Sequence, residues 1–279
     1  MQVSRPGQSY VEAPPPQALA RFVACLWSMR IPVRTDTRMR ILPNGCVDIV
    51  VYASDTSLGE GSAQIVAPPH RSFVVGSTLR SFFVRSSGSR HVVGASLLPA
   101  GVQALLGVPA RVIGERIVLL EDIVGATAIA MEDRILSTTH DRALSGIGDA
   151  LLRLRASREV PPVIARAVHS IRAAGGQRRI DALARETNLS ARQLERAFLE
   201  HVGVSPKTYS RLVRFDRAAR GINTRGPLPW SQFALVHGYS DQAHLVNEFT
   251  AFAGIPPAQF ERELASAWPG PATSTDRVP

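Results

Sequence analysis

The chain of 279 residues is long enough for two domains, and its 45% hydrophobic and 20% charged residues are ordinary for a globular protein. A net charge of +9 favours a polyanionic partner, either nucleic acid or an acidic membrane surface. Two cysteines are too few for a disulfide scaffold. No signal peptide is visible and no segment approaches the roughly 18 apolar residues of a membrane span, so we expect a cytoplasmic protein without membrane contact.

Residues 20–98 carry short runs rich in Val, Ile and Phe, separated by Gly, Pro, Asn and Ser. The runs are "ILPNGCVDIVVYA" (41–53), "AQIVAPP" (63–69), "FVVGST" (73–78), "SFFVRSS" (81–87) and "HVVGASLL" (91–98). Their spacing predicts a β-barrel or a double-sheet jelly roll. Asp48 alternates with apolar neighbours, so its side chain points either into a barrel or out to water, and we favour the second. His70 and His91 are the only histidines of this region, so neither a metal nor a cofactor is predicted.

Helical spacing replaces this pattern from residue 101. It runs through "GVQALLG" (101–107), "LLEDIVGATAIAMEDRILSTT" (119–139) and "DRALSGIGDALLRLRAS" (141–157). In the last segment Leu144, Ile147, Leu151 and Leu154 share one stripe, and the helices at 120–156 are the expected contact of a dimer. Charged residues and paired prolines in "SREVPP" (157–162) mark a boundary.

We therefore expect an α+β protein of two domains. Residues 1–157 are predicted to form a β-rich domain with C-terminal helices that can support dimerisation, residues 158–267 an all-helical domain, and residues 268–279 a flexible tail.

Within the helical region, residues 190–209 and 241–260 repeat one pattern at a constant offset of 51. The matched pairs are Leu194 and Leu245, Phe198 and Phe249, Gly203 and Gly254, and Pro206 and Pro257. Each copy opens with an N-cap residue, Ser190 or Asp241, and follows a short helix and a turn (180–190 and 230–240). Two helix–turn–helix units are the simplest account, with recognition helices at 190–202 and 241–253.

A basic amphipathic helix, "SPKTYSRLVRFDRAARGIN" (205–223), joins the copies. About sixteen helical residues span roughly 24 Å. A rigid spacer of this kind could set two recognition helices into successive major grooves of DNA, about 34 Å apart. Residues 161–267 hold fourteen Lys and Arg against nine Asp and Glu, which gives this region a net charge of +5.

The exposed faces of the two predicted recognition helices carry side chains that suit contact with base edges. These candidates are Arg192, Gln193, Glu195 and Arg196 in the first helix, and Gln242, Ala243, Val246 and Asn247 in the second. The candidates for contact with phosphates are Arg178, Arg179, Ser190, Lys207, Arg211 and Arg214.

The runs "LSARQLERAF…GVSPKTY…R…RA" and "GYSDQAHLVNEF…GIPPAQF" resemble the AraC/XylS family of bacterial transcription regulators over residues 163–264. The resemblance implies that the base-facing positions of the first helix are Arg192, Glu195 and Arg196, and it adds His244 to those of the second. This chain has Asn247 where the family usually has a basic residue, and Leu245 where phenylalanine is common. Weaker phosphate binding by the second unit is therefore expected. Residues 42–52, 73–77 and 91–125 are similar, more distantly, to the cupin-like sensor domain of uncharacterised members, although "LLPAG" (97–101) departs from their pattern.

The partners that follow are double-stranded promoter or operator DNA, RNA polymerase, a small-molecule effector in the N-terminal domain and a second copy of the chain. The predicted function is sequence-specific regulation of transcription without enzymatic activity. One alternative is a DNA-repair or other enzyme fused to a DNA-binding domain, but Cys25 and Cys46 lack the context of an activated nucleophile. A membrane-surface protein is a further alternative, and it leaves the duplication unexplained.

Overall fold

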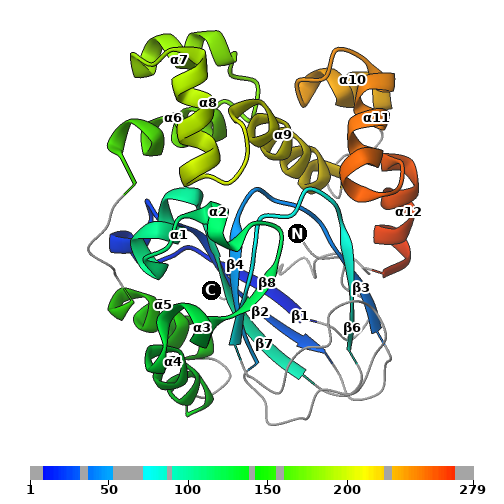
Figure 1. Ribbon diagram of the computed structural model, residues 1–279. Helices are drawn as coiled ribbons and strands as arrows, with labels where there is room; N and C mark the ends of the chain where they lie inside the picture. Colours follow the sequence, from blue (N-terminus) through cyan, green and yellow to red (C-terminus); the bar gives the residue numbers. More distant parts are fainter. Residues whose placement is uncertain are drawn as a thin grey trace, which may run out of the picture.

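A β-rich N-terminal part and a helical C-terminal part make up the computed structural model (Figure 1). The structure describes residues 9–31, 37–52, 72–86, 90–137, 142–154, 160–222 and 228–267. The α+β, two-domain prediction is confirmed. The proposed boundary near residue 157, the tail at 268–279 and the run at 63–69 lie outside the described residues.

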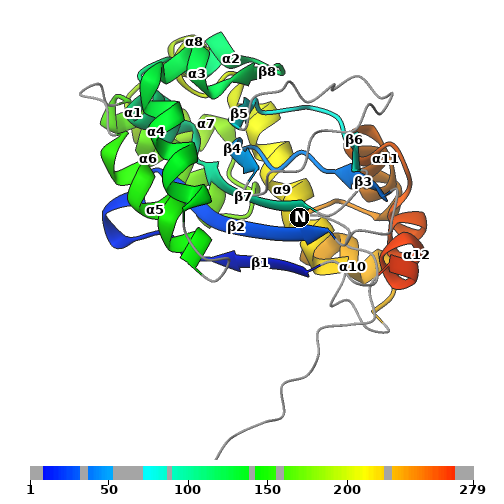
Figure 2. The ribbon, with the colours of Figure 1, turned by 90° about the horizontal axis from the view of Figure 1, so that it is seen from below.

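Antiparallel strands build a six-stranded sheet in the order β1-β2-β7-β4-β5-β8 and a separate two-stranded sheet, β3-β6. The strands are β1 (Ser9–Ala13), β2 (Val23–Ile31), β3 (Thr37–Ile41), β4 (Val47–Tyr52), β5 (Ser72–Val75), β6 (Phe82–Ser86), β7 (Arg90–Leu97) and β8 (Ile117–Leu119). Figure 2 shows the larger sheet with helices along one side. Because β1 and β8 are edge strands of five and three residues, their local patterns are weak, and the sequence did not predict them.

Strand β4 is buried on one face and largely covered on the other, where Asp48 and Tyr52 are half-buried. Its odd-numbered residues pack into the core beneath the helices, together with Val93 and Ala95 of β7. Val50 points the other way, into a second apolar cluster with Trp27 and with Val84 of β6. Asp48 shares this second face, where Ser96 donates a hydrogen bond to its carboxylate and burial raises its pKa. The expectation that Asp48 faces water is therefore wrong, because β4 is a central strand between two covered layers.

Five helices, two before β8 in the chain and three after it, cover the first face of the larger sheet (Figure 2). They are α1 (Pro99–Leu106), α2 (Ala110–Ile113), α3 (Leu120–Val124), α4 (Ala126–Leu136) and α5 (Ala143–Arg153), and the short 3-10 helix η1 (Gln17–Leu19) precedes β2. The predicted stripe of α5 is confirmed, since Ile147, Leu151 and Leu154 are buried and Leu144 packs against the same cluster.

The C-terminal part is built from helices alone. They are α6 (Pro162–Ala173), α7 (Ile180–Thr187), α8 (Ala191–His201), α9 (Pro206–Ile222), α10 (Trp230–Val236), α11 (Gln242–Ala253) and α12 (Pro257–Ala267). Helix α9 is the central element, with α6–α8 at one end and α10–α12 at the other, and it lies above the strands of the N-terminal part (Figure 1). None of the described helices has the length and apolarity needed to cross a bilayer.

We expect Gly101→Ala to destabilise the protein, although alanine is intrinsically the better helix former by about 1 kcal/mol. Gly101 lies in α1, where a Cβ atom would collide with the carbonyl oxygen of Phe22. That carbonyl cannot move freely because it accepts a hydrogen bond of 2.8 Å from the Leu98 N–H. The expected loss is about 1–3 kcal/mol in the free energy of unfolding, measured by urea denaturation.

Gly148→Ala in α5 is the matched control, because the atoms nearest to a Cβ there belong to the Leu26 and Pro16 side chains and lie at 3.3 Å, with no backbone collision among them. A Gly101→Ala variant as stable as Gly148→Ala would contradict the steric account.

Candidate DNA-binding surface

The first helix–turn–helix unit consists of α7 and α8, joined by a turn at Asn188 and Leu189. Asn188 adopts the left-handed conformation with φ of 54°, which asparagine tolerates better than most residues. Ser190 then caps α8 in a full capping box, since its hydroxyl accepts from the Gln193 N–H and the Gln193 side chain accepts from the Ser190 N–H. The predicted N-cap residue of this helix, Ser190, is confirmed.

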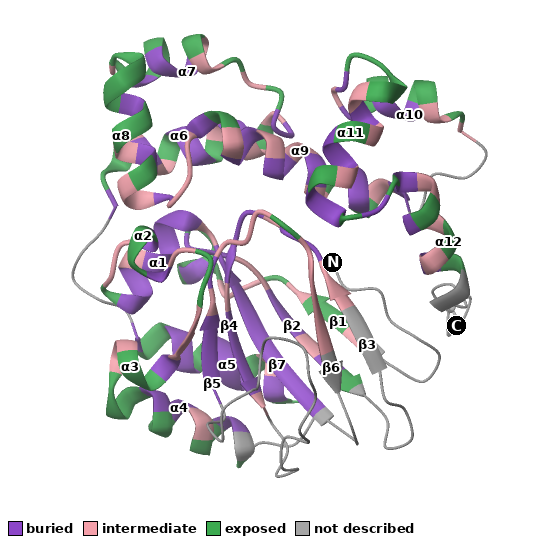
Figure 3. Ribbon diagram, turned by 45° about the vertical axis from the view of Figure 1, so that its right-hand side comes forward, coloured by how far each residue is buried: buried purple, intermediate pink, exposed green. Residues whose placement is uncertain are grey.

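Helix α8 divides cleanly into a buried and an exposed face. Leu194 and Phe198 are fully buried, as the sequence predicted. Arg192, Glu195 and Arg196 are exposed, and Figure 3 shows the outer side of α7 and α8 as an exposed edge of the molecule. Gln193 is exposed as well, but its side-chain oxygen is occupied by the capping box at 2.9 Å from the Ser190 nitrogen. Its amide N–H₂ group is therefore the part that remains for a ligand.

The second unit, α10 and α11, repeats this plan with different capping chemistry. Asp241 caps α11 by accepting a hydrogen bond of 2.7 Å from the His244 N–H, and this bond lowers the pKa of Asp241. A carboxylate that stays ionised suits the positive end of the helix dipole. The turn uses Gly238 in the left-handed conformation, with φ of 79°, as the sequence indicated.

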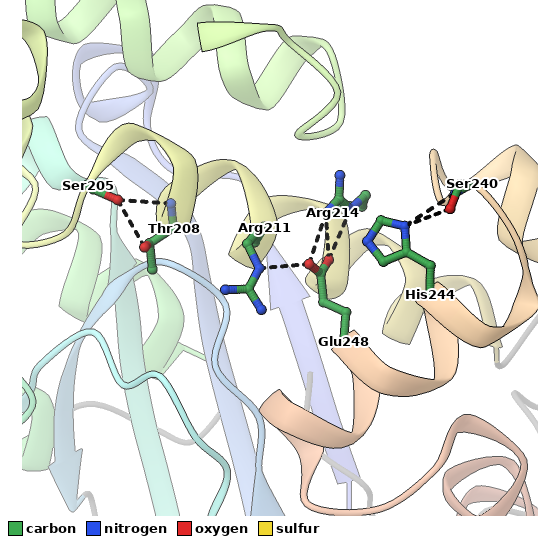
Figure 4. A network of polar contacts seen from close by, with 7 residues as sticks. All are labelled: Ser205, Thr208, Arg211, Arg214, Ser240, His244 and Glu248. Carbon is green, nitrogen blue, oxygen red and sulfur yellow. Dashed lines mark hydrogen bonds and ion pairs between the residues drawn. The ribbon is translucent and has the colours of Figure 1, made fainter. Parts of the chain in front are cut away.

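The outward face of α11 carries no charged side chain between its first and last residue. Gln242, Ala243 and Asn247 are exposed, and Val246 is half-buried. His244 is also half-buried, and its Nδ1 lies 3.1 Å from the Ser240 hydroxyl. This contact turns the ring toward the start of the helix (Figure 4).

The only acidic residue inside α11, Glu248, is buried and paired with two arginines of α9 (Figure 4). The Arg214 guanidinium donates to both carboxylate oxygens at 2.9 Å, and Arg211 Nε donates to one of them at 2.8 Å. The exposed fraction of the Glu248 side chain is 4%, against 15% for Arg214 and 40% for Arg211. A carboxylate this deep needs charged partners, so the ion pairs fix α11 against α9.

Aromatic rings extend this network. Arg214 lies over the Tyr239 ring at 4.9 Å and Arg211 over the Phe252 ring at 5.2 Å. Burial, and then the nearby charge of Glu248, raise the pKa of Tyr239, which keeps its phenol neutral. The start of α9 is itself fixed, because the Ser205 hydroxyl accepts from the Thr208 N–H at 3.2 Å.

The predicted phosphate-contacting residues do not form one group. Lys207 is exposed at the start of α9, and Ser190 is exposed while it caps α8. Arg178 forms an ion pair with Glu186, and Arg179 forms one with Asp181 at 3.1 Å. Arg211 and Arg214 instead have the structural role described above.

Glu248 is the important residue that the sequence interpretation missed. It lies three residues after Leu245 and one before Phe249, so helical periodicity alone places it on the buried stripe. A carboxylate at such a position demands a buried cation, and the arginines of the neighbouring amphipathic helix were the available partners. That signal was present in the sequence.

The cysteines do not fit the alternative of an activated nucleophile. Burial raises the pKa of the Cys25 thiol and raises that of Cys46 to about 12, whereas a reactive cysteine needs a lowered pKa. In the described part of the chain, no three His, Cys, Asp or Glu side chains are grouped so that they could hold a metal ion.

Two family models match the sequence, one in each part of the molecule. Residues 183–263 match the model described as "Helix-turn-helix domain", an AraC-type model, over α8 to α11 and most of α7 and α12. The C-terminal part is an AraC-type DNA-binding domain. Residues 11–118, which include all eight strands except the ends of β1 and β8, match "Domain of unknown function (DUF6597)". No curated protein matches the chain.

Solved structures of AraC-type proteins are similar to the chain at low identity. The C-terminal domain of AraT, a response regulator from Geobacillus stearothermophilus, is 23% identical over 43% of this chain and 95% of its own, with a TM-score of 0.36. ToxT from Vibrio cholerae is 11% identical over 85% of this chain and 97% of its own, with a TM-score of 0.46. A ToxT structure with a bound unsaturated fatty acid is 12% identical over 93% of this chain and 92% of its own, with a TM-score of 0.39.

The AraC-type domain indicates that this protein is a DNA-binding transcription regulator. Its two helix–turn–helix units are the repeated segments that the offset of 51 residues indicated. The resemblance to the AraC/XylS family is thereby confirmed.

We expect Arg214→Ala to destabilise the AraC-type domain by about 3 kcal/mol, because buried Glu248 would lose its bidentate partner. Arg211→Ala is expected to cost less than about 1 kcal/mol, since Arg211 is 40% exposed and Arg214 still pairs with Glu248. Urea denaturation followed by circular dichroism measures both.

Asp181→Ala, which breaks only exposed ion pairs, with Arg179 and Arg185, serves as the control and should leave the unfolding midpoint nearly unchanged. Equal losses for the two arginine variants would contradict the ranking by burial.

Proposed function

We propose that the protein regulates transcription by reading two DNA elements, with α8 and α11 in successive major grooves. The observation that carries this proposal is the pair of capped helices, each with an exposed outer face, at opposite ends of one helix (Figure 1). Helix α9 has seventeen residues and therefore spans about 25 Å. A separation of that order suits two neighbouring grooves on one side of a duplex, about 34 Å apart.

The two recognition helices would read bases by different means. On α8, Arg192 and Arg196 are suited to guanine and Glu195 to the amino group of cytosine, because their charged ends are exposed. The amide N–H₂ group that Gln193 keeps free is a further candidate on this face.

On α11 the base-reading groups are neutral. Gln242 and Asn247 are suited to adenine, while Ala243 and Val246 can contact a thymine methyl group. His244, near the start of the helix, is placed to contact a base or the adjoining backbone.

Phosphate contacts would come mainly from the first unit and the start of α9. Exposed Lys207 and Arg179 are the strongest candidates, and Arg178 and Ser190 lie in the same unit. Arg211 keeps 40% of its side chain exposed and can contribute, whereas Arg214 is 15% exposed and is bound to Glu248. This distribution supports stronger electrostatic binding by the first unit.

We further propose that the N-terminal domain controls the DNA-binding domain through a small-molecule effector or through pairing of two chains. Support for an effector comes from the second face of the larger sheet, where Asp48 and Ser96 form a polar pair beside Trp27 and half-buried Cys25. Support for a dimer comes from α4 and α5, where Ile129 is 46% and Leu152 is 41% exposed. RNA polymerase remains a predicted partner.

Selection of bound duplexes from a random DNA library tests the central proposal. The purified chain should enrich two short elements whose centres lie about one helical turn apart, near 10 base pairs. Enrichment of a single element would reject the proposal that the protein recognises two elements. Salt-sensitive binding without any enrichment would reject sequence-specific recognition.

Two substitutions then separate base reading from phosphate binding. Arg196→Ala is expected to cost about 1–3 kcal/mol of binding free energy at one base position and to relax the preference there. Lys207→Ala should weaken binding to all sequences alike and lower the slope of log affinity against log salt by about 1. Fluorescence anisotropy with the selected duplex and its single-base variants measures both, and a uniform loss for Arg196→Ala would reassign that residue to the backbone.

A further inference from the structure

The two repeated units contact the N-terminal domain through equivalent positions of their own fold. Gly203 and Gly254 occupy matched positions, 51 residues apart, just after the two recognition helices. Both are left-handed, with φ of 87° and 74°. A Cβ atom on Gly203 would lie 3.7 Å from Ala110, and one on Gly254 would lie 3.6 Å from the Ser81 hydroxyl. Two different parts of the N-terminal domain therefore meet equivalent points of the duplicated fold.

At the second unit, the N-terminal domain binds the C-terminal end of α11 through its backbone. Arg40 of β3 donates to the Ala253 carbonyl at 2.9 Å, and the Ser81 hydroxyl donates to the same oxygen at 2.7 Å. The Ser81 N–H donates to the Phe252 carbonyl at 2.7 Å. These are among the last carbonyls of the helix, which have no partner within it and carry the negative end of its dipole.

Arg40 is the central residue of this contact. Its side chain is only 11% exposed, and its guanidinium lies 4.5 Å from the centre of the Phe83 ring and 3.4 Å from the Glu263 carboxylate of α12. Leu42 adds an apolar contact, because it is buried in the cluster of the second unit. One arginine of the N-terminal domain thus binds both α11 and α12.

At the first unit the contact is made by side chains. Arg111 of α2 pairs with Glu200 at 2.6 Å, and the Gln103 side chain lies 3.1 Å from His201 Nδ1. Both partners lie at the C-terminal end of α8. The N-terminal domain therefore holds each recognition helix by the end that follows its base-reading residues.

Helix α9 connects the two units, which also touch where Gly238 of the second turn faces the Gln177 side chain just before α7. We call the contacts at the C-terminal ends of α8 and α11 the two anchors. Because both anchors belong to one β-rich domain, the units cannot rotate independently about α9. We propose that Arg40, assisted by Ser81, is a positioning residue that sets the spacing and rotation between the two DNA elements the protein accepts. This inference rests on the proposed double reading of DNA.

Binding to duplexes with altered spacing tests the proposal in the full-length protein. The selected duplex is compared with duplexes in which two base pairs are inserted or removed between the elements, which rotates one element by roughly 70°. The unmodified protein should lose at least about tenfold in affinity at the altered spacings, because only one unit then engages. In Arg40→Ala the loss should shrink to within about threefold, while binding to a duplex with the first element alone stays unchanged.

Two further variants control this experiment. Arg153→Ala removes an equal charge from an exposed position of α5 in the same domain and should behave as the unmodified protein. Ser81→Ala removes one hydrogen bond and leaves the buried Arg40 in place, so it provides the test if Arg40→Ala unfolds. An unchanged spacing penalty in both Arg40→Ala and Ser81→Ala would overturn the proposal, and so would tighter binding at every spacing, which would make the contact an inhibitory one.

A distance measurement separates this inference from the proposed function. Spin labels on Ala191→Cys and Ala251→Cys, both exposed, report the separation of α8 and α11 by pulsed electron spin resonance in protein that also carries Cys25→Ser. One narrow distance distribution should broaden on Arg40→Ala, and an unaltered distribution would overturn the positioning role. The measurement needs no DNA, so a failed duplex selection would reject the proposed function without deciding this result.

Discussion

The buried carboxylate of Glu248 is the constraint on which the DNA-binding domain depends most. A charge that is 4% exposed is tolerable only because Arg214 and Arg211 bind it, and this requirement fixes one face of α11 against α9. The matched position of the first unit, 51 residues earlier, is Ala197, which needs no such partner. The two copies therefore share a fold, but α8 and α11 are held in place by different interactions.

This difference also determines which positively charged side chains of the domain are available to bind DNA. Helix α9 is rich in arginine, yet Arg214 neutralises Glu248 and Arg220 pairs with Asp216 at 3.1 Å and with Glu12 of β1 at 3.2 Å. On α8, in contrast, the side chains of Arg192 and Arg196 are exposed to solvent. The net charge counted from the sequence overstates the positive charge available to bind DNA, because some arginines form ion pairs within the protein.

The features that could be predicted from the sequence are those that local physics determines. The caps Ser190 and Asp241, the buried stripes and the spacing of the two units follow from periodicity and capping chemistry within a few residues. Strand β8 and the environment of Asp48 could not be predicted in this way, because each depends on strands that are far away in the sequence. The contact of Arg40 with Ala253 spans 213 residues and leaves no local pattern at either end.

The two anchors of the N-terminal domain differ in a way that bears on how the regulator can change. At α8 the partners are the side chains of Glu200 and His201, so that anchor depends on residue identity. At α11 the acceptors are the backbone carbonyls of Phe252 and Ala253, which any residue supplies. Substitutions on the outer face of α11 therefore leave its attachment to the N-terminal domain intact.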